Sequence, residues 1–219
     1  MLRAVLFDLD GTLIDSEKIY HRIEMEIASE LGYDFFRPQD ALDMRSLYRA
    51  ASIELMAGRY GDAFDYDKYH DLMTTRFMAE ASRCGIELKP GIDEVLGYLK
   101  DRGLIAAVVT ATALERATKV MSDVGLAGRF DDVISAHEVK KGKPNPDPYL
   151  YACDKLGITP EEALCIEDSP NGVLSGVAAG IRTVMIPDLT EPDDELRGVL
   201  FDCVPSLADL PKVIEGILQ

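Results

Sequence analysis

The chain has 219 residues, of which 47% are hydrophobic, and a net charge of −16. This length can form one substantial core and a smaller second unit, whereas the acidity argues against a nucleic-acid binder, which needs a basic face. No apolar run approaches the ~20 residues of a membrane span, and the N-terminus has no signal-peptide pattern. We therefore expect a cytoplasmic protein, by default a monomer, with neither a nucleic-acid nor a membrane partner. The four cysteines form no CxxC pair and are expected to be free thiols.

The first predicted element is a buried strand that ends in acidic residues. The apolar run at 2–7 is too short and too rich in β-formers for a helix, and Asp8, Asp10, Gly11 and Thr12 follow it. Two carboxylates this close repel each other, so a folded protein normally neutralises them with a metal, a proton or a cationic side chain. The combination suits a hard cation and a phosphoryl group better than a hydrophobic core.

The next part of the chain is predicted to be helical. Ser16 is a plausible N-cap, apolar residues then recur every four positions as far as Leu31, and Gly32 ends the helix. Residues 40–60 and 67–83 give further helical patterns, and nothing up to Gly85 resembles a strand. We therefore predict an α-helical cap domain at 16–85, inserted into a core domain made of residues 1–15 and 86–219.

From residue 88 onward, helix and strand alternate. Strands are expected at 104–109, 132–135, 163–166 and 183–186, with a short one near 203, and helical patterns lie between them. This alternation predicts an α/β fold, a doubly wound, Rossmann-like parallel sheet. Such sheets bind ligands beyond the carboxyl ends of their strands. Thr110 and the pair Glu167-Asp168 end predicted strands, just as Asp8 and Asp10 do.

These side chains together suit phosphoryl transfer. Asp8 could ligate Mg²⁺ and attack phosphorus, and Asp10 could act as general acid and then as base. Glu167 and Asp168 would complete an oxygen-rich Mg²⁺ site. The hydroxyl of Thr110 and one lysine of the 140–143 loop would contact the phosphoryl group.

Each residue also has a purely structural explanation. Asp10-Gly11 could form a plain turn, Thr110 could satisfy local backbone, and Asp168 could cap the helix that begins at Pro170. The lysines of the 140–143 loop could simply be solvated. All four explanations would have to coincide at one edge of one sheet, so a shared site is favoured.

Four ordered motifs resemble those of the haloacid dehalogenase-like superfamily. They are Asp8-Leu9-Asp10-Gly11-Thr12, Thr110 after an apolar strand, Gly142-Lys143-Pro144-Asn145-Pro146, and Glu167-Asp168-Ser169-Pro170-Asn171-Gly172. The resemblance spans the whole chain, and the insert resembles the small helical cap of the subgroup that contains β-phosphoglucomutase and many sugar-phosphate phosphatases. The family's fold and chemistry are therefore expectations for this chain.

The resemblance implies a role for each motif residue. Asp8 would be the nucleophile, and Asp10 the acid/base with its backbone carbonyl on Mg²⁺. Thr110 and Lys143 would hold the phosphoryl group, the Gly-Lys-Pro context selecting Lys143 over Lys140 and Lys141. Asp168 would ligate Mg²⁺ directly, and Glu167 directly or through water. Substrate contacts are assigned to Leu9, Thr12, Ala111 and Arg45.

Arg45 stands about where the subgroup places an arginine that grips a distal phosphate, with a surface salt bridge as its alternative. The mutases of the subgroup typically carry a cap histidine where this chain has Tyr20, and an aromatic residue where it has Glu24. His21 is rotated by ~100° on a helix and is not expected to substitute.

These departures favour hydrolysis over a mutase reaction. We predict a Mg²⁺-dependent phosphatase for a small phosphorylated metabolite, a sugar phosphate above all. A β-phosphoglucomutase-like enzyme is the first alternative. A non-catalytic receiver-like module is the second, although it would need neither the cap nor this length.

Overall fold

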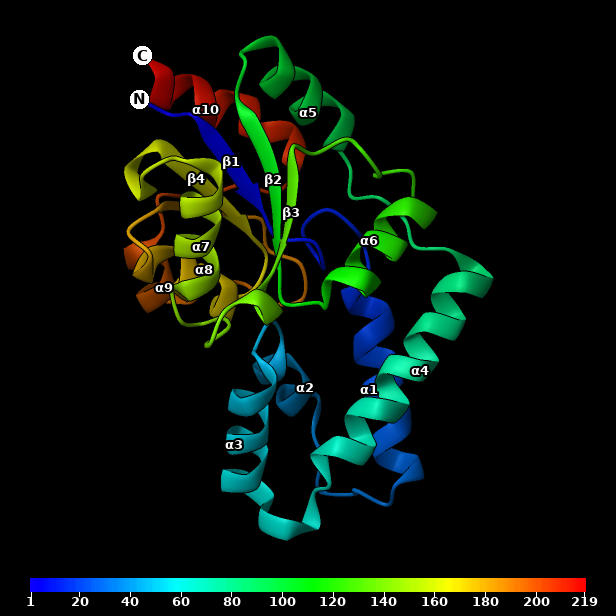
Figure 1. Ribbon diagram of the computed structural model, residues 1–219. Coiled ribbons are helices and arrows are strands. Elements are labelled where there is room, and N and C mark those ends of the chain that lie inside the picture. The colour runs from blue at the N-terminus through cyan, green and yellow to red at the C-terminus, as the bar shows by residue number, and fades with distance from the viewer.

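Six parallel strands form the central sheet of the computed structural model, which describes residues 1–219 (Figure 1). Their order is β3-β2-β1-β4-β5-β6. The chain thus builds outward from β1 on one side and then, from β4, on the other, so the topological switch point lies between β1 and β4. The strands are β1 (Ala4–Phe7), β2 (Ile105–Thr110), β3 (Asp132–Ser135), β4 (Ala163–Glu167), β5 (Arg182–Met185) and β6 (Asp202–Cys203). The predicted doubly wound α/β fold is confirmed.

The central strands β1, β2 and β4 are mostly apolar because helices cover both faces of the sheet. Val5 and Phe7 of β1 pack in the same cluster as α5 (Ile92–Asp101), α6 (Leu114–Asp123) and α10 (Leu210–Leu218). Ala4 and Leu6 point the other way, toward α7 (Asp147–Leu156) and the end of α8 (Pro170–Ala178). Alternate side chains of one strand thus serve two cores.

Four helices form a separate layer at the carboxyl edge of the sheet (Figure 1). They are α1 (Glu17–Glu30), α2 (Pro38–Met44), α3 (Arg49–Tyr60) and α4 (Tyr66–Cys84), and they contain no strand, as expected. The long helices α1 and α4 pack against each other, and the aromatic rings of Tyr33, Phe36, Phe64 and Tyr69 lie against one another within the layer. We call α1 to α4 the cap helices.

Two chain segments connect the cap helices to the sheet, and they lie side by side. Ile14 and Leu88 form an antiparallel bridge. The Asp15 N–H donates to the Glu87 carbonyl at 2.9 Å, and the Lys89 N–H donates to the Leu13 carbonyl at 2.9 Å. The cap helices are therefore joined to the sheet through one narrow, paired neck.

The structure differs from expectation in some details. Glu167 is the last residue of β4 rather than the first after it. Helix α9 (Asp194–Val199) was not anticipated, because its pattern is short; the Asp193 side chain caps it. The longest helix, α4, has 19 residues, and none combines the length and apolarity of a membrane span. All four cysteines are free.

Candidate active site

Three carboxylates meet where β1 and β4 end. Asp8 follows β1, Glu167 ends β4, and Asp168 comes next; one oxygen of each lies within 4.8 Å of the others. Their proximity follows from the strand register, since Phe7 lies opposite Ile166 in the parallel pair. All three side chains are buried. The structure thus brings together three of the acids that the sequence singled out, at the switch point of the sheet.

Lys143 lies between two of these acids. Its Nζ donates to Asp8 Oδ1 at 2.6 Å, to Glu167 Oε1 at 2.6 Å and to the Val109 carbonyl at 3.0 Å, and its side chain is fully buried. Burial alone would lower the pKa of Lys143, but Asp8 and Glu167 raise it above its usual value, so the ammonium is held charged. Lys140 and Lys141 are exposed, as expected for a solvated loop.

The cluster has the features of a divalent-cation site. Asp8 Oδ2 and Asp168 Oδ1 are buried without a hydrogen-bond partner. Burial raises the pKa of Asp8 and of Asp168, because too little positive charge faces them. The side chains in contact here are four acids and two bases, namely Asp8, Glu17, Glu167 and Asp168 with Lys143 and Arg45. A hard cation bound by carboxylate oxygens fits this imbalance.

Asp168 does not cap the helix that follows, and its Oδ1 has no hydrogen-bond partner. The N-cap of α8 is Ser169, whose hydroxyl accepts the Gly172 N–H at 3.1 Å. The capping alternative for Asp168 is therefore wrong.

Asp10 occupies a separate position, held by two hydroxyls. Ser16 Oγ donates to Asp10 Oδ1 at 2.8 Å, and Thr112 Oγ1 donates to Asp10 Oδ2 at 2.9 Å. The Asp10 side chain is not part of the carboxylate cluster, which leaves only its backbone carbonyl for a metal. Ser16 is the N-cap residue of α1, as predicted, but its hydroxyl donates to Asp10 and makes no side-chain cap bond. Thr112 was missed, although its motif Thr110-Ala111-Thr112 is visible in the sequence.

Thr110 is fully buried at the end of β2, and its hydroxyl accepts the Thr112 N–H at 3.0 Å. It thus supports local backbone, while its own hydrogen is free to be donated. Leu9 is part of the hydrophobic core and Thr12 is buried, and neither lines the cavity described below. Any contact of these two with a substrate would come from their backbone.

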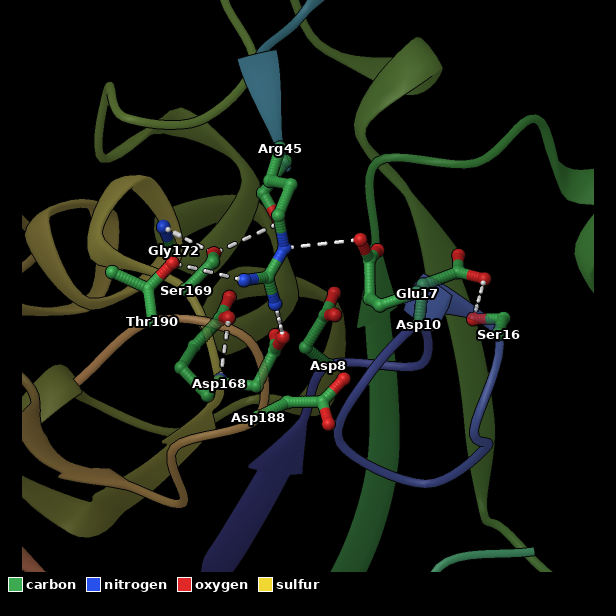
Figure 2. A network of polar contacts seen from close by, with 12 residues as sticks. Asp8, Asp10, Ser16, Glu17, Arg45, Asp168, Ser169, Gly172, Asp188 and Thr190 are labelled. Carbon is green, nitrogen blue, oxygen red and sulfur yellow. Dashed lines mark hydrogen bonds and ion pairs between the residues drawn. The ribbon is translucent and has the colours of Figure 1, made fainter. Parts of the chain in front are cut away.

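Arg45 reaches from the cap helices into the acids (Figure 2). It follows α2, and its side chain is only 4% exposed. Its Nε lies 3.0 Å from Glu17 Oε2, Nη2 pairs with Asp168, and Nη1 donates to Thr190 Oγ1 at 3.3 Å. The alternative of a surface salt bridge is therefore wrong: the ion pairs are buried and link the cap to the sheet edge.

A cavity of about 420 Å³ lies between this edge and the cap helices. Asp8, Asp10, Arg45 and Ala111 line it from the site, and the cap helices contribute the side chains of Tyr20, Glu24 and Tyr69. The Tyr20 ring stacks on Phe77 with centroids 3.8 Å apart. His21 does not line the cavity. A small molecule held in this cavity could therefore reach acids of the site.

Known proteins resemble this chain in sequence and in structure. The family model of haloacid dehalogenase-like hydrolases matches residues 5–186. Hexitol phosphatase B of Escherichia coli K12 is 31% identical over 211 residues, which cover 94% of this chain and 93% of the relative. A crystal structure of a CbbY variant from Rhodobacter sphaeroides with xylulose 1,5-bisphosphate is 28% identical, with a TM-score of 0.79 over 96% of both chains.

A β-phosphoglucomutase structure from Clostridium difficile has a TM-score of 0.81 at 21% identity and covers 100% of both chains, which shows a common fold. The family model covers most of this chain, and the expected motifs converge on one sheet edge. The chain belongs to the haloacid dehalogenase-like hydrolase family.

Proposed function

We propose that the chain is a Mg²⁺-dependent phosphatase that hydrolyses a small sugar phosphate through an aspartyl-phosphate on Asp8. The observation that carries this proposal is the buried cluster of Asp8, Lys143, Glu167 and Asp168, which borders a cavity at the switch point of the sheet. A phosphoric monoester hydrolase agrees with the family and with the hexitol phosphatase relative.

In this proposal the two aspartates carry out separate steps. A carboxylate oxygen of Asp8 attacks phosphorus, and the bond from phosphorus to the sugar oxygen breaks. Asp10 gives its proton to that leaving oxygen and later takes one from the water that attacks the aspartyl-phosphate. This second attack releases inorganic phosphate and restores Asp8. The Ser16 and Thr112 hydroxyls hold Asp10 in place for both transfers.

Asp8, Asp168, Glu167 and the backbone carbonyl of Asp10 would hold the Mg²⁺. When bound, the ion would offset the negative charge of the phosphoryl group and of the acids around it. Lys143 adds a fixed positive charge beside Asp8. Thr110 has a hydroxyl hydrogen to donate to a phosphoryl oxygen.

Metal removal should abolish turnover. We expect EDTA to eliminate hydrolysis of p-nitrophenyl phosphate and added Mg²⁺ to restore it. Mg²⁺ that binds only the folded state should also raise Tm as it is titrated. At a hundredfold excess over Kd, the free energy of unfolding should increase by about 2.7 kcal/mol. The Asp168→Asn variant should lose most of that rise. A rise of the same size in Asp168→Asn would contradict the assigned ligand set.

We further propose that residues 16–85 move as a cap domain relative to residues 1–15 and 86–219. Ser16 and the 88–91 segment would be the hinges, at the paired neck where Ile14 meets Leu88. Closure would exclude bulk water during transfer. The ion pair between Arg45 and Asp168 joins the two proposed parts and would break if they moved apart.

A phosphate-release screen over sugar phosphates, with and without Mg²⁺, tests the proposed function. The competing mutase activity is tested with β-glucose 1-phosphate and a bisphosphate primer. Glucose 6-phosphate formed without net phosphate release would show that the enzyme is a mutase and not a phosphatase. Tyr20, which lines the cavity where the mutases carry a histidine, favours hydrolysis.

Gly11→Ala should reduce kcat far more than stability. Gly11 has φ +84°, and a Cβ there would lie 2.2 Å from Asp168 Oδ2. Displacing Asp168 by even ~1 Å should cost about 10²-fold in kcat. Gly103→Ala is the matched control, since Gly103 also has a positive φ of +64° but nothing within 4 Å of its Cβ. Equal activity losses in the two variants would show that backbone strain, and not Asp168, is responsible.

A further inference from the structure

The chain between α2 and α3 lies against the loops that carry the site residues of the sheet edge. We call residues 45–48 the α2–α3 linker. Its first residue, Arg45, enters the acid cluster. At its other end, the Tyr48 N–H donates to the Lys143 carbonyl at 3.2 Å, and a Cβ on Gly142 would lie 2.5 Å from the Tyr48 Cβ. The linker therefore couples the position of the cap helices to that of the site.

The carbonyls at the C-terminal end of α2 are satisfied from two sides. The last carbonyls of a helix have no partner within that helix. Backbone N–H groups of the cap helices donate to the Leu42 carbonyl at 3.3 Å and to the Met44 carbonyl at 3.1 Å. The carbonyls of Asp43 and Arg45, which alternate with these, accept instead from the side-chain amide of Asn171 at 3.1 and 2.8 Å. Asn171 belongs to α8, so a residue outside the cap helices caps one of them.

The backbone of the linker has a further sign of being held in place. Ser46 has a φ of +60°, in the left-handed region that is unfavourable for a residue with a Cβ. Such a conformation persists where the surrounding contacts fix it. The hydroxyl of Ser169, the N-cap residue of α8, donates to Ser46 Oγ at 2.9 Å. The start of α8 thus holds the linker at two neighbouring positions.

We propose that Asn171 is a positioning residue that holds the α2–α3 linker, and with it the Arg45 side chain, against the sheet edge when the cap is closed. An asparagine suits this role because its amide has two hydrogens to donate, and two carbonyls face it. When the cap opens, both carbonyls lose this partner, so the two bonds favour the closed arrangement. The inference rests on the proposed cap movement and names a residue that controls it.

The test measures cap closure without any substrate. The Tyr48 amide hydrogen is bonded to a carbonyl outside the cap helices, so its exchange with solvent deuterium reports opening. We expect Asn171→Ala to speed this exchange about tenfold, since two hydrogen bonds that favour closure are lost. Gly142→Ala should speed it as well, because the new Cβ would collide with Tyr48. This second variant shows that the measurement responds to opening.

Asn171→Asp separates positioning from a purely structural role in α8. The aspartate keeps the size of the side chain but turns a carboxylate toward two carbonyls, so Tyr48 should exchange faster than in Asn171→Ala. An acid in the first turn of a helix is favourable, so a residue that served only α8 would give the opposite order. Asp65→Ala is the control, because it removes a helix cap within the cap helices, the bond from the Lys68 N–H at 3.0 Å. It should leave the exchange of Tyr48 unchanged.

Amide hydrogens inside α4 should keep their wild-type exchange rates in both Asn171 variants, which shows that the cap helices stay folded. Wild-type exchange of Tyr48 in Asn171→Ala, with faster exchange in Gly142→Ala, would overturn the inference. So would slower exchange in Asn171→Asp than in Asn171→Ala. Wild-type protein that exchanges Tyr48 as fast as Gly142→Ala would instead overturn the proposed cap closure. Lack of activity on every phosphomonoester, with these exchange results intact, would overturn the proposed phosphatase alone.

Discussion

Replacing Asp8 by Asn should reduce kcat for p-nitrophenyl phosphate by at least about 10⁴-fold, because removal of a nucleophile removes the covalent route altogether. The amide keeps the size of the carboxylate and can still accept from Lys143. It also removes one of several mutually repelling buried acids, whose repulsion contributes to the raised pKa of Asp8. We therefore expect Tm to stay constant or rise while activity disappears.

Asp10→Asn is the comparison that separates the two aspartates. Its kcat should fall about 10²- to 10⁴-fold, which is the usual contribution of a general acid–base catalyst. Because Asp8 is intact in this variant, a phosphoryl adduct should be detectable by intact-mass measurement, and Asp8→Asn should show none. Unchanged aryl phosphate turnover in Asp8→Asn would disprove every version of the catalytic model.

Lys143→Met should damage both folding and turnover. Its ammonium is the only cation within hydrogen-bond distance of Asp8 and Glu167, and it is completely buried. Breaking a buried ion pair from one side costs about 3–5 kcal/mol, because it leaves the partner charge uncompensated. For a chain of this size we expect Tm, measured in EDTA, to fall by roughly 10 °C.

Lys140→Met and Lys141→Met provide the controls for this prediction. Both lysines belong to the same loop, are exposed and make no ion pair. Each substitution should change the free energy of unfolding by no more than about 0.5 kcal/mol, so Tm should stay nearly constant. A similar loss in all three variants would mean that the loop as a whole, and not the buried charge of Lys143, accounts for the effect.

Much of the site was predictable because parallel strands impose a simple rule. Asp8 directly follows β1, and Thr110 and Glu167 end β2 and β4. Because the carboxyl ends of parallel strands meet at one edge, their proximity followed once the strands were recognised. The Gly-Lys-Pro context selected Lys143 from three nearby lysines, and the structure places that one lysine between the acids.

The structural explanations that competed with these roles had mixed outcomes. Asp10-Gly11 does lie in a turn, in which the Leu13 N–H donates to the Leu9 carbonyl at 3.0 Å. Thr110 does accept a backbone N–H. Neither observation removes the residue from the site, because a turn and a strand end are also the places where side chains are free to face a ligand.

The contacts between the cap and the sheet were not predictable. From the sequence, a surface salt bridge was as good an explanation of Arg45 as a phosphate contact. Only the tertiary structure places its side chain between Glu17 and Asp168. Ser16 and Thr112 are far apart in sequence, yet both donate to Asp10. Local patterns carry no information on which helix face meets which strand end.

The sequence by itself determined the α/β class, the family and the group of acids with one lysine, because strand periodicity and motif residues are local properties. Only the tertiary structure decided how the charges are paired and which cap residues face the cavity. Those outcomes depend on long-range packing, which brought Tyr20 and Glu24 of α1 and Tyr69 of α4 to the same cavity.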